Sequence, residues 1–160
     1  MASKFINFSF TIDATDDEAK DFESMVTAYD RIATDQLDMD EDEHLAEYVD
    51  RIKSSGMFTD SGSLGISTEN AGDYLGIYSE GNGNLEALMD LLKHHLAHFN
   101  SDQIIVFTYS ETCDRPRYGA FGGGAVVITK DSIQNIDAMG AGKAAAKLIE
   151  DARALDAPKM

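Results

Sequence analysis

Apolar and polar positions alternate along the first segment of the chain, residues 4–12. Alternation with a period of two is typical of a β-strand that buries one face and exposes the other. The segment is therefore predicted to form a strand with one set of side chains facing the core. That set is Ile6, Phe8, Phe10 and Ile12.

Apolar residues then recur at spacings of three and four over residues 16–35, which is typical of an amphipathic helix. Thr15 followed by Glu18 has the pattern of a capping box, so the helix is predicted to begin here. A second apolar stripe predicts a shorter helix over residues 41–54, and Gly56 is suited to end it in the left-handed conformation.

A hairpin and a third helix are predicted next. Residues 63–69 and 74–80 resemble each other at an offset of eleven and are separated by a short polar stretch, which favours two paired strands. Asn84 follows a Gly-Asn-Gly break and is suited to cap a helix over residues 85–99.

Two more strands and a last helix are predicted in the remaining chain. The strands are expected over residues 103–113 and within residues 120–130, and the glycines at 122–124 are expected to allow a bulge, a twist or a close backbone approach. An alanine-rich helix is predicted over residues 142–155. Its expected buried stripe is Ala144, Leu148, Ala152 and Leu155.

The resulting order is β-α-α-β-β-α-β-β-α, which predicts an α+β fold. We expect an antiparallel sheet with helices packed mainly on one face. With only two prolines and no linker, residues 1–160 are predicted to form a single domain, and an acidic helical segment, residues 13–55, lies within it.

The charge of the chain is concentrated in one block. The formal net charge is −16, and residues 13–50 carry 15 of the 29 acidic side chains against only Lys20 and Arg31. Such a charge argues against direct binding to nucleic acid or to an anionic membrane, because phosphates would repel it. One cysteine, no signal-peptide pattern and no long apolar run lead us to expect a cytoplasmic protein.

The acidic block has two interpretations: a solvated helical face, or a surface that binds a basic partner. Carboxylates three and four residues apart on a helix lie about 5–6 Å from each other. Phosphates along a nucleic-acid strand are separated by roughly 7 Å, so the block can imitate nucleic acid toward a basic groove. The predicted partner-binding residues are Asp16, Asp17, Asp21, Glu23, Asp30, Asp40, Glu41, Asp42, Glu43 and Glu47.

The polar loop Glu111–Tyr118, between two apolar strands, is the alternative site. Its arginines suit an anionic small ligand, since guanidinium forks fit carboxylate or phosphate, and the glycine-rich strand follows it. A nucleophilic cysteine would need a nearby base, and no histidine is close in sequence. The residues of this alternative ligand site are Glu111, Cys113, Asp114, Arg115 and Arg117.

Motifs for metals, nucleotides and defined reactions are incomplete. Asp38, Asp40 and Asp42 have the opening spacing of an EF-hand loop, but the required glycine and the final glutamate are missing. His94 and His98 are one helical turn apart, as in zinc sites, but without the glutamate that such enzymes use as a base. We therefore predict a non-enzymatic protein with no metal, no cofactor and no catalytic residue.

One segment carries a resemblance. FTYSETCDRPRYGAFGGGAVVIT, residues 107–129, resembles a segment of small, mostly uncharacterised phage and mobile-element proteins. Acidic proteins of that context include anti-restriction and anti-CRISPR inhibitors that imitate DNA. The resemblance implies such a context and assigns no role to any residue.

Together these observations predict a protein-binding module that engages a basic, nucleic-acid-binding protein, such as a host defence protein, through residues 13–50. The alternative is a small-molecule-binding protein or enzyme that uses the Glu111–Tyr118 loop. A third hypothesis is a metal-responsive protein that uses His94 and His98. The sequence leaves open the partner's identity, the oligomeric state, the source organism, whether these histidines bind a metal, and whether the carboxylates form one continuous patch.

Overall fold

The chain builds one six-stranded sheet. A computed structural model describes residues 4–57, 62–113 and 122–156. Within these residues the strand order is β2-β3-β1-β4-β5-β6, and the five neighbouring pairs are antiparallel. The strands are β1 (Lys4–Asp13), β2 (Ser67–Asn70), β3 (Tyr74–Gly81), β4 (Ile105–Cys113), β5 (Gly122–Ile128) and β6 (Ile133–Asp137).

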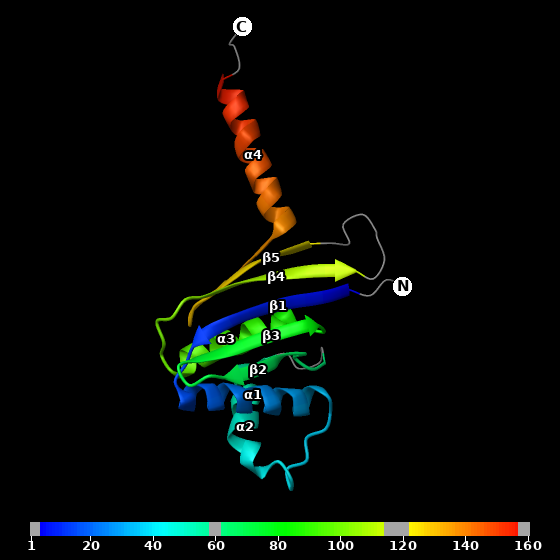
Figure 1. The fold of residues 1–160 in the computed structure, drawn as a ribbon, viewed down its shortest axis with the longest axis vertical. Coiled ribbons are helices and arrows are strands. Elements are labelled where there is room, and N and C mark those ends of the chain that lie inside the picture. The colour runs from blue at the N-terminus through cyan, green and yellow to red at the C-terminus, as the bar shows by residue number, and fades with distance from the viewer. Residues whose placement is uncertain (1–3, 58–61, 114–121, 157–160) are drawn as a thin grey trace.

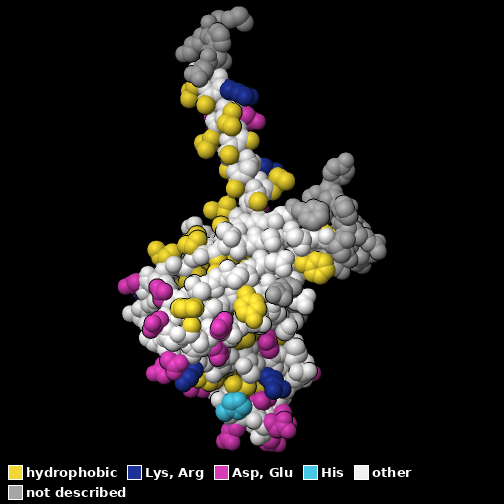
Figure 2. Space-filling model, in the orientation of Figure 1, with side chains coloured by type: hydrophobic (Ala, Val, Ile, Leu, Met, Phe, Trp, Pro, Cys, Tyr) yellow, Lys and Arg dark blue, Asp and Glu magenta, His cyan; other side chains and the backbone are white. Residues whose placement is uncertain are grey.

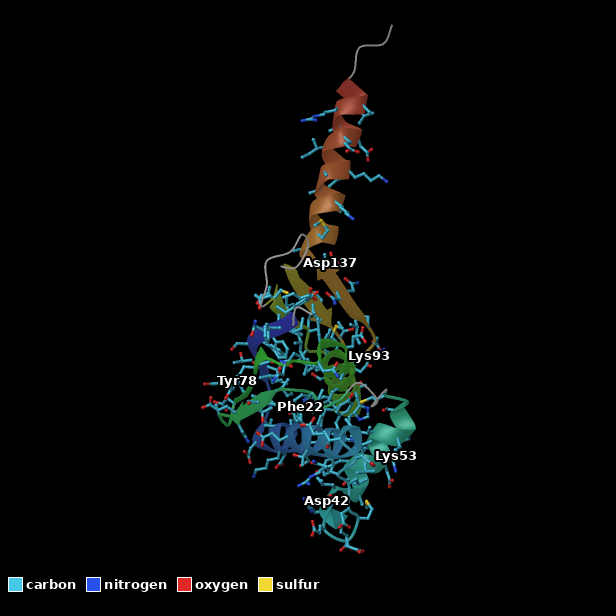
Figure 3. The ribbon with its side chains drawn as sticks, turned by 90° about the vertical axis from the view of Figure 1, so that its right-hand side faces the viewer. Phe22, Asp42, Lys53, Tyr78, Lys93 and Asp137 are labelled. Atoms are coloured by element: carbon cyan, nitrogen blue, oxygen red, sulfur yellow. The ribbon has the colours of Figure 1, made fainter. Side chains whose placement is uncertain are left out.

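Within the described residues, three of the four α-helices lie on one side of this sheet, and the other face is open (Figures 1 and 3). Two of the three pack against strands, and the remaining one packs against its neighbouring helix. Figure 3 shows Phe22 among the helices and Tyr78 on the opposite, open side of the sheet. The fourth helix, α4, stands away from the sheet at its β6 edge (Figure 1). The helices are α1 (Asp16–Ala33), the short 3-10 helix η1 (Glu43–Leu45), α2 (Ala46–Ser55), α3 (Leu85–His98) and α4 (Ala138–Asp156).

The core lies between the sheet and helices α1 to α3. Strand β1 buries Phe8 and Ile12 and exposes Ser9 and Thr11, as its alternating pattern predicts. The ring of Phe10 stacks on that of Phe107 with 4.1 Å between the centroids. Such contacts join neighbouring strands through apolar area removed from water, which is the dominant favourable contribution to folding.

The predicted helix ends are present. The Thr15 hydroxyl oxygen accepts a hydrogen bond from the Glu18 amide at 3.3 Å and begins α1. The Asn84 side chain accepts from the amide of Ala87 and begins α3. Gly56 has φ +75° and ends α2 in the left-handed conformation. A helix terminus needs partners for its unpaired backbone groups or a residue that adopts the left-handed conformation. These needs are met by residues close in sequence, so the sequence predicts the helix ends.

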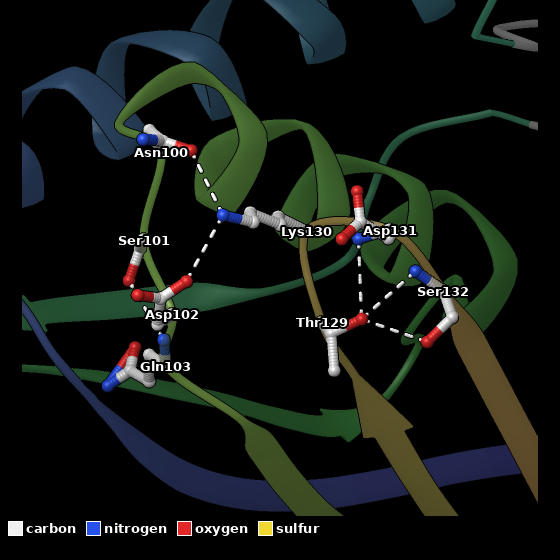
Figure 4. A network of polar contacts seen from close by, with 8 residues as sticks. All are labelled: Asn100, Ser101, Asp102, Gln103, Thr129, Lys130, Asp131 and Ser132. Carbon is white, nitrogen blue, oxygen red and sulfur yellow. Dashed lines mark hydrogen bonds and ion pairs between the residues drawn. The ribbon is translucent and has the colours of Figure 1, made fainter.

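The α+β class and the succession of elements follow the prediction, with η1 and one strand added. The added strand, β6, pairs with β5 through a turn that polar groups close (Figure 4). The Thr129 hydroxyl accepts from the Ser132 amide at 3.0 Å, and Lys130 donates to Asp102 at 3.1 Å. Strand β6 is short, polar and largely exposed at the sheet edge, so it lacks the buried alternation that would have predicted it.

Helix α4 departs from the prediction in one respect. The helix forms, but its expected apolar stripe is not buried: Leu148 is 70 % exposed and Leu155 is 87 % exposed. The prediction of a buried stripe is therefore wrong for the single chain, because α4 leaves the sheet instead of lying on it (Figure 1).

Candidate functional site

Exposed carboxylates gather at the end of the molecule that is formed by the loop after α1, by η1 and by α2. Residues 32–50 contain eight carboxylates and neither lysine nor arginine. Seven of the eight are exposed, and we call this group the acidic pole. Acidic side chains crowd this end in Figure 2, and α4 lies at the opposite end. The acidic pole consists of Asp35, Asp38, Asp40, Glu41, Glu43, Glu47 and Asp50.

The eighth carboxylate, Asp42, is buried and shapes the loop. Its Oδ2 accepts a hydrogen bond from the Asp38 amide at 3.1 Å, and the Asp38 carboxylate accepts from the Asp40 amide at 3.0 Å. The Asp42 carbonyl accepts from the Leu45 amide, which starts η1. Carboxylates therefore hold this loop through backbone hydrogen bonds, a local pattern that aspartate favours.

We expect Asp42→Ala to lower the free energy of unfolding by about 1 to 2 kcal/mol, because the Asp38 amide loses a part-buried acceptor. Asp42→Asn keeps an acceptor oxygen and should cost less. Asp40→Ala, at an exposed neighbouring position, is the matched control. Urea denaturation followed by circular dichroism measures all three, and equal effects of Asp42→Ala and Asp40→Ala would contradict the role given to Asp42.

Helix α2 holds the acidic pole against the rest of the fold. Its apolar side buries Val49 and Ile52. On its flank, the Arg51 guanidinium donates two hydrogen bonds to the Asp21 carboxylate of α1, at 2.7 and 3.1 Å. The Nε atom of Arg51 also donates a hydrogen bond to Nε2 of His94, which lies on α3, at 3.3 Å. One side chain thus joins three helices, and the exposed carboxylates project from an anchored segment.

The outer side of α1 carries mixed charge. Asp16 pairs with Lys20 at 2.8 Å and accepts from the Asn70 side chain, and the hydrogen bond from Lys20 holds the pKa of Asp16 below its usual value. Arg31 is also exposed on this helix. The dense negative charge therefore belongs to the acidic pole, and α1 adds a more balanced border.

The ten predicted partner-binding residues divide by environment. Asp30 accepts from the Leu64 amide at 2.8 Å, and its burial raises its pKa; Asp21 is occupied by Arg51. Asp35, Asp38 and Asp50 are exposed carboxylates absent from the predicted set, although the charge of the surrounding segment pointed to them. Of the ten, Asp16, Asp17, Asp40, Glu41, Glu43 and Glu47 are exposed, Asp21, Glu23 and Asp30 are partly buried, and Asp42 is buried.

The alternative site is described only in part. Glu111 and Cys113 lie at the end of β4 and are partly buried, whereas Asp114, Arg115 and Arg117 lie outside the described residues. Beside β4 is a hollow of about 460 Å³, which Glu111, Tyr109 and Asn135 help to line. The Tyr109 hydroxyl donates to Asn135 at 2.9 Å across the glycine-rich strand β5.

The glycine run of β5 allows this arrangement. A Cβ on Gly124 would lie 2.4 Å from the carbonyl oxygen of Ile136 and 3.0 Å from the Tyr109 hydroxyl. Glycine is needed here for a close approach of neighbouring groups, which was one of the roles predicted for it.

The histidines of α3 take part in packing and hydrogen bonding. The rings of His94 and His98 stack with 6.1 Å between centroids, and Arg51 donates to His94. Burial, with a smaller effect of the Arg51 charge, lowers the pKa of His94. No group of three or more His, Cys, Asp or Glu side chains within residues 4–57, 62–113 and 122–156 is placed to hold a metal ion.

Comparisons with family models, with curated proteins and with solved structures found no match. Among the helices that the structure describes, none has the length and apolar character needed to cross a membrane.

Proposed function

We propose that this chain is a non-enzymatic binding protein whose acidic pole engages a basic, nucleic-acid-binding protein. The observation that carries the proposal is the exposure of seven carboxylates at one end of the molecule, in a segment without lysine or arginine. Like charges so close together repel one another and reduce the stability of the fold, so a complementary partner would relieve a cost that the free protein bears.

The spacing of these carboxylates supports nucleic-acid mimicry in particular. Glu47 and Asp50 are three residues apart on α2, Glu43 precedes them in η1, and all three are exposed. Side chains three residues apart on an α-helix, as Glu47 and Asp50 are, lie about 5–6 Å from each other, close to the roughly 7 Å between phosphates of a strand. A basic groove adapted to phosphates would attract this row, and salt would weaken the attraction.

The partner class follows from the same chemistry. A host protein that handles DNA or RNA, such as one that restricts foreign DNA, presents the required basic groove. The resemblance of residues 107–129 to segments of phage and mobile-element proteins is the reason to test this class first.

The test compares two triple variants with the same change of charge. Asp40→Lys, Glu43→Lys and Glu47→Lys reverse the acidic pole, and the control reverses three exposed carboxylates elsewhere: Glu69, Asp73 and Asp131. Each protein is used to capture partners from a lysate fraction enriched in nucleic-acid-binding proteins, at low and at moderate salt.

We expect the wild type and the control to retain a basic protein that added DNA or RNA displaces. The pole variant should lose at least about tenfold in affinity, since several charge pairs turn from attractive to repulsive. Full binding by the pole variant would contradict the proposal. Equal loss in both variants would assign the effect to total charge instead of the acidic pole.

The hollow beside β4 supports a second candidate, a small-ligand site. Its polar groups, including Glu111 and the hydrogen-bonded pair of Tyr109 and Asn135, converge on a space of about 460 Å³. Screening nucleotides and metabolites by thermal shift tests it. A ligand that stabilises the wild type but not a Glu111→Ala variant would favour this candidate, and no shift across the library would count against it.

A further inference from the structure

Helix α4 is exposed along its whole described length. It follows β6 directly, and the Asp137 carboxylate accepts a hydrogen bond from the Gly140 amide at its start. Beyond this base, every residue from 138 to 155 is exposed, and the helix projects from the body (Figures 1 and 2). Most helical stability in proteins comes from packing an apolar face, and α4 packs none of its own within the described chain.

The apolar residues of α4 form a seam. Five of them are spaced by four, three, four and three residues, which is the pattern of a helix that packs along another helix. Its two leucines are exposed, Leu155 at 87 % and Leu148 at 70 %. Ile149, which borders the seam, is 54 % exposed. The seam consists of Ala141, Ala145, Leu148, Ala152 and Leu155.

Four of the six charged residues of α4 lie away from the seam, and Asp151 and Asp156 border it. From the helical repeat, Lys143, Lys147, Glu150 and Arg153 fall within about a third of the circumference, on the opposite side. A partner can therefore cover the seam without burying an ionised group, which would be costly.

The charge distribution indicates which partner fits. Helix α4 carries three basic and three acidic residues and is neutral, whereas residues 1–137 carry 26 acidic against 9 basic side chains. Its first half holds Lys143 and Lys147, and its second half carries a net charge of −2. An antiparallel pair brings the positive half of each helix near the negative half of the other. Because Lys143 and Lys147 face away from the seam, this attraction acts at long range, and the helix dipoles favour the same orientation.

We propose that α4 pairs with α4 of a second copy of the chain in an antiparallel, twofold-symmetric arrangement. In such an interface residue i meets residue j and j meets i, so the Leu155 end of one helix lies against the Ala141 end of the other. The alanines let the two backbones approach closely. A parallel pair would place like charges together and bring two strongly acidic bodies side by side, whereas the antiparallel pair holds them at opposite ends.

The area available for pairing is small for a specific interface. A helix of 19 residues is about 28 Å long, so the paired helices bury on the order of 1,000 Å² in total, at the lower limit of specific interfaces. We therefore expect a dimer that dissociates in the micromolar range.

Sedimentation equilibrium of the full chain, from about 1 to about 100 μM, tests the pairing. The wild type should approach twice the mass of one chain as concentration rises. Ala145→Lys places a charge in the seam and should weaken association at least tenfold. Ala154→Lys makes the same change on the opposite side of the helix and should leave association unchanged. Circular dichroism of each variant establishes that the fold is retained.

Disulfide crosslinking tests the orientation, in a Cys113→Ser background. A mixture of Ala141→Cys and Leu155→Cys chains should crosslink on oxidation, whereas Leu155→Cys alone should not. Crosslinking of Leu155→Cys alone would overturn the antiparallel arrangement. A monomer at every concentration, or equal effects of the two lysine variants, would overturn the pairing. Because no basic partner is present, these outcomes are independent of the function proposed for the acidic pole.

Discussion

We expect the substitution Arg51→Ala to lower the free energy of unfolding by about 3 kcal/mol. Arg51 and Asp21 form a bidentate ion pair in which both side chains are mostly buried, with 13 % and 14 % of their surfaces exposed. Removing the guanidinium leaves the Asp21 carboxylate without its cation in a place where water compensates poorly. It also removes the hydrogen bond to His94, so α2 loses its polar tie to both α1 and α3.

Controls separate this ion pair from ordinary surface charge. Lys20→Ala removes an exposed pair with Asp16 and should cost less than about 1 kcal/mol. Arg51→Lys keeps the charge but cannot form the two-pronged contact, so it should fall between the wild type and Arg51→Ala. Urea denaturation at neutral pH measures each value. An Arg51→Ala cost as small as that of Lys20→Ala would show that the buried pair contributes no more than a surface pair.

The same substitution bears on the proposed function. The acidic pole is carried by η1 and α2, and Arg51 is the polar contact that joins α2 to the other helices. A less firmly held α2 would present Glu47 and Asp50 in a wider range of positions, and the entropy lost on binding would increase. We therefore expect Arg51→Ala to weaken partner binding although it leaves every carboxylate of the acidic pole in place.

The elements that could be predicted are those whose signals are local. The alternation in β1, the capping box at Thr15 and the stop at Gly56 each depend on residues within a few positions of one another. Such patterns reflect the geometry of a single strand or helix end, so the chain displays them before any tertiary contact is known.

The details that could not be predicted depend on distant residues. Asp21 and Arg51 are thirty residues apart, and nothing near either position shows that they meet. Asp42 looks like its exposed neighbours in sequence, yet the fold of its loop buries it. Helix α4 has an apolar stripe of the kind that usually covers a core. Whether the stripe packs on the core depends on the direction in which the chain leaves β6.

The candidate site shows the same division. The sequence places the negative charge in residues 13–50, and the structure shows the exposed part to be densest on the loop, η1 and α2. On α1, Lys20 and Arg31 share the outer side with Asp16 and Asp17, which a count along the chain does not reveal. Charge along a sequence predicts a surface only where consecutive residues stay on the same side of the fold.

Acidification should destabilise the fold through His95. This ring is 3 % exposed, lies edge-on to Phe22 and Phe99, and its Nδ1 has no hydrogen-bond partner in the described part of the chain. Burial lowers its pKa from 6.5 to about 4. Asp21 and Glu18 oppose that shift and Arg51 adds to it, but burial is the largest cause.

The sign follows from proton binding in the two states. Above pH 6.5 the ring is neutral in both, and His95 contributes no pH dependence. Between pH 6.5 and about 4 the unfolded chain binds a proton that the folded chain does not, so stability falls as the pH falls. The difference between the two pKa values corresponds to about 3 kcal/mol of the free energy of unfolding. This amount is fully lost once the pH is below the pKa of His95 in the folded state.

A comparison with His95→Phe isolates this contribution. Phenylalanine keeps an aromatic ring between Phe22 and Phe99 and cannot be protonated. Burial raises the pKa of Asp30 and of Asp90, and these carboxyls stabilise the fold as the pH falls, but they are present in both proteins and cancel in the difference. Urea denaturation from pH 7.5 to 4 measures the free energy of unfolding of both proteins. Between pH 7.5 and pH 5, the difference between the variant and the wild type should change by about 2 kcal/mol in favour of the variant. A constant difference across this range would mean that the folded state protonates His95 as readily as the unfolded chain does.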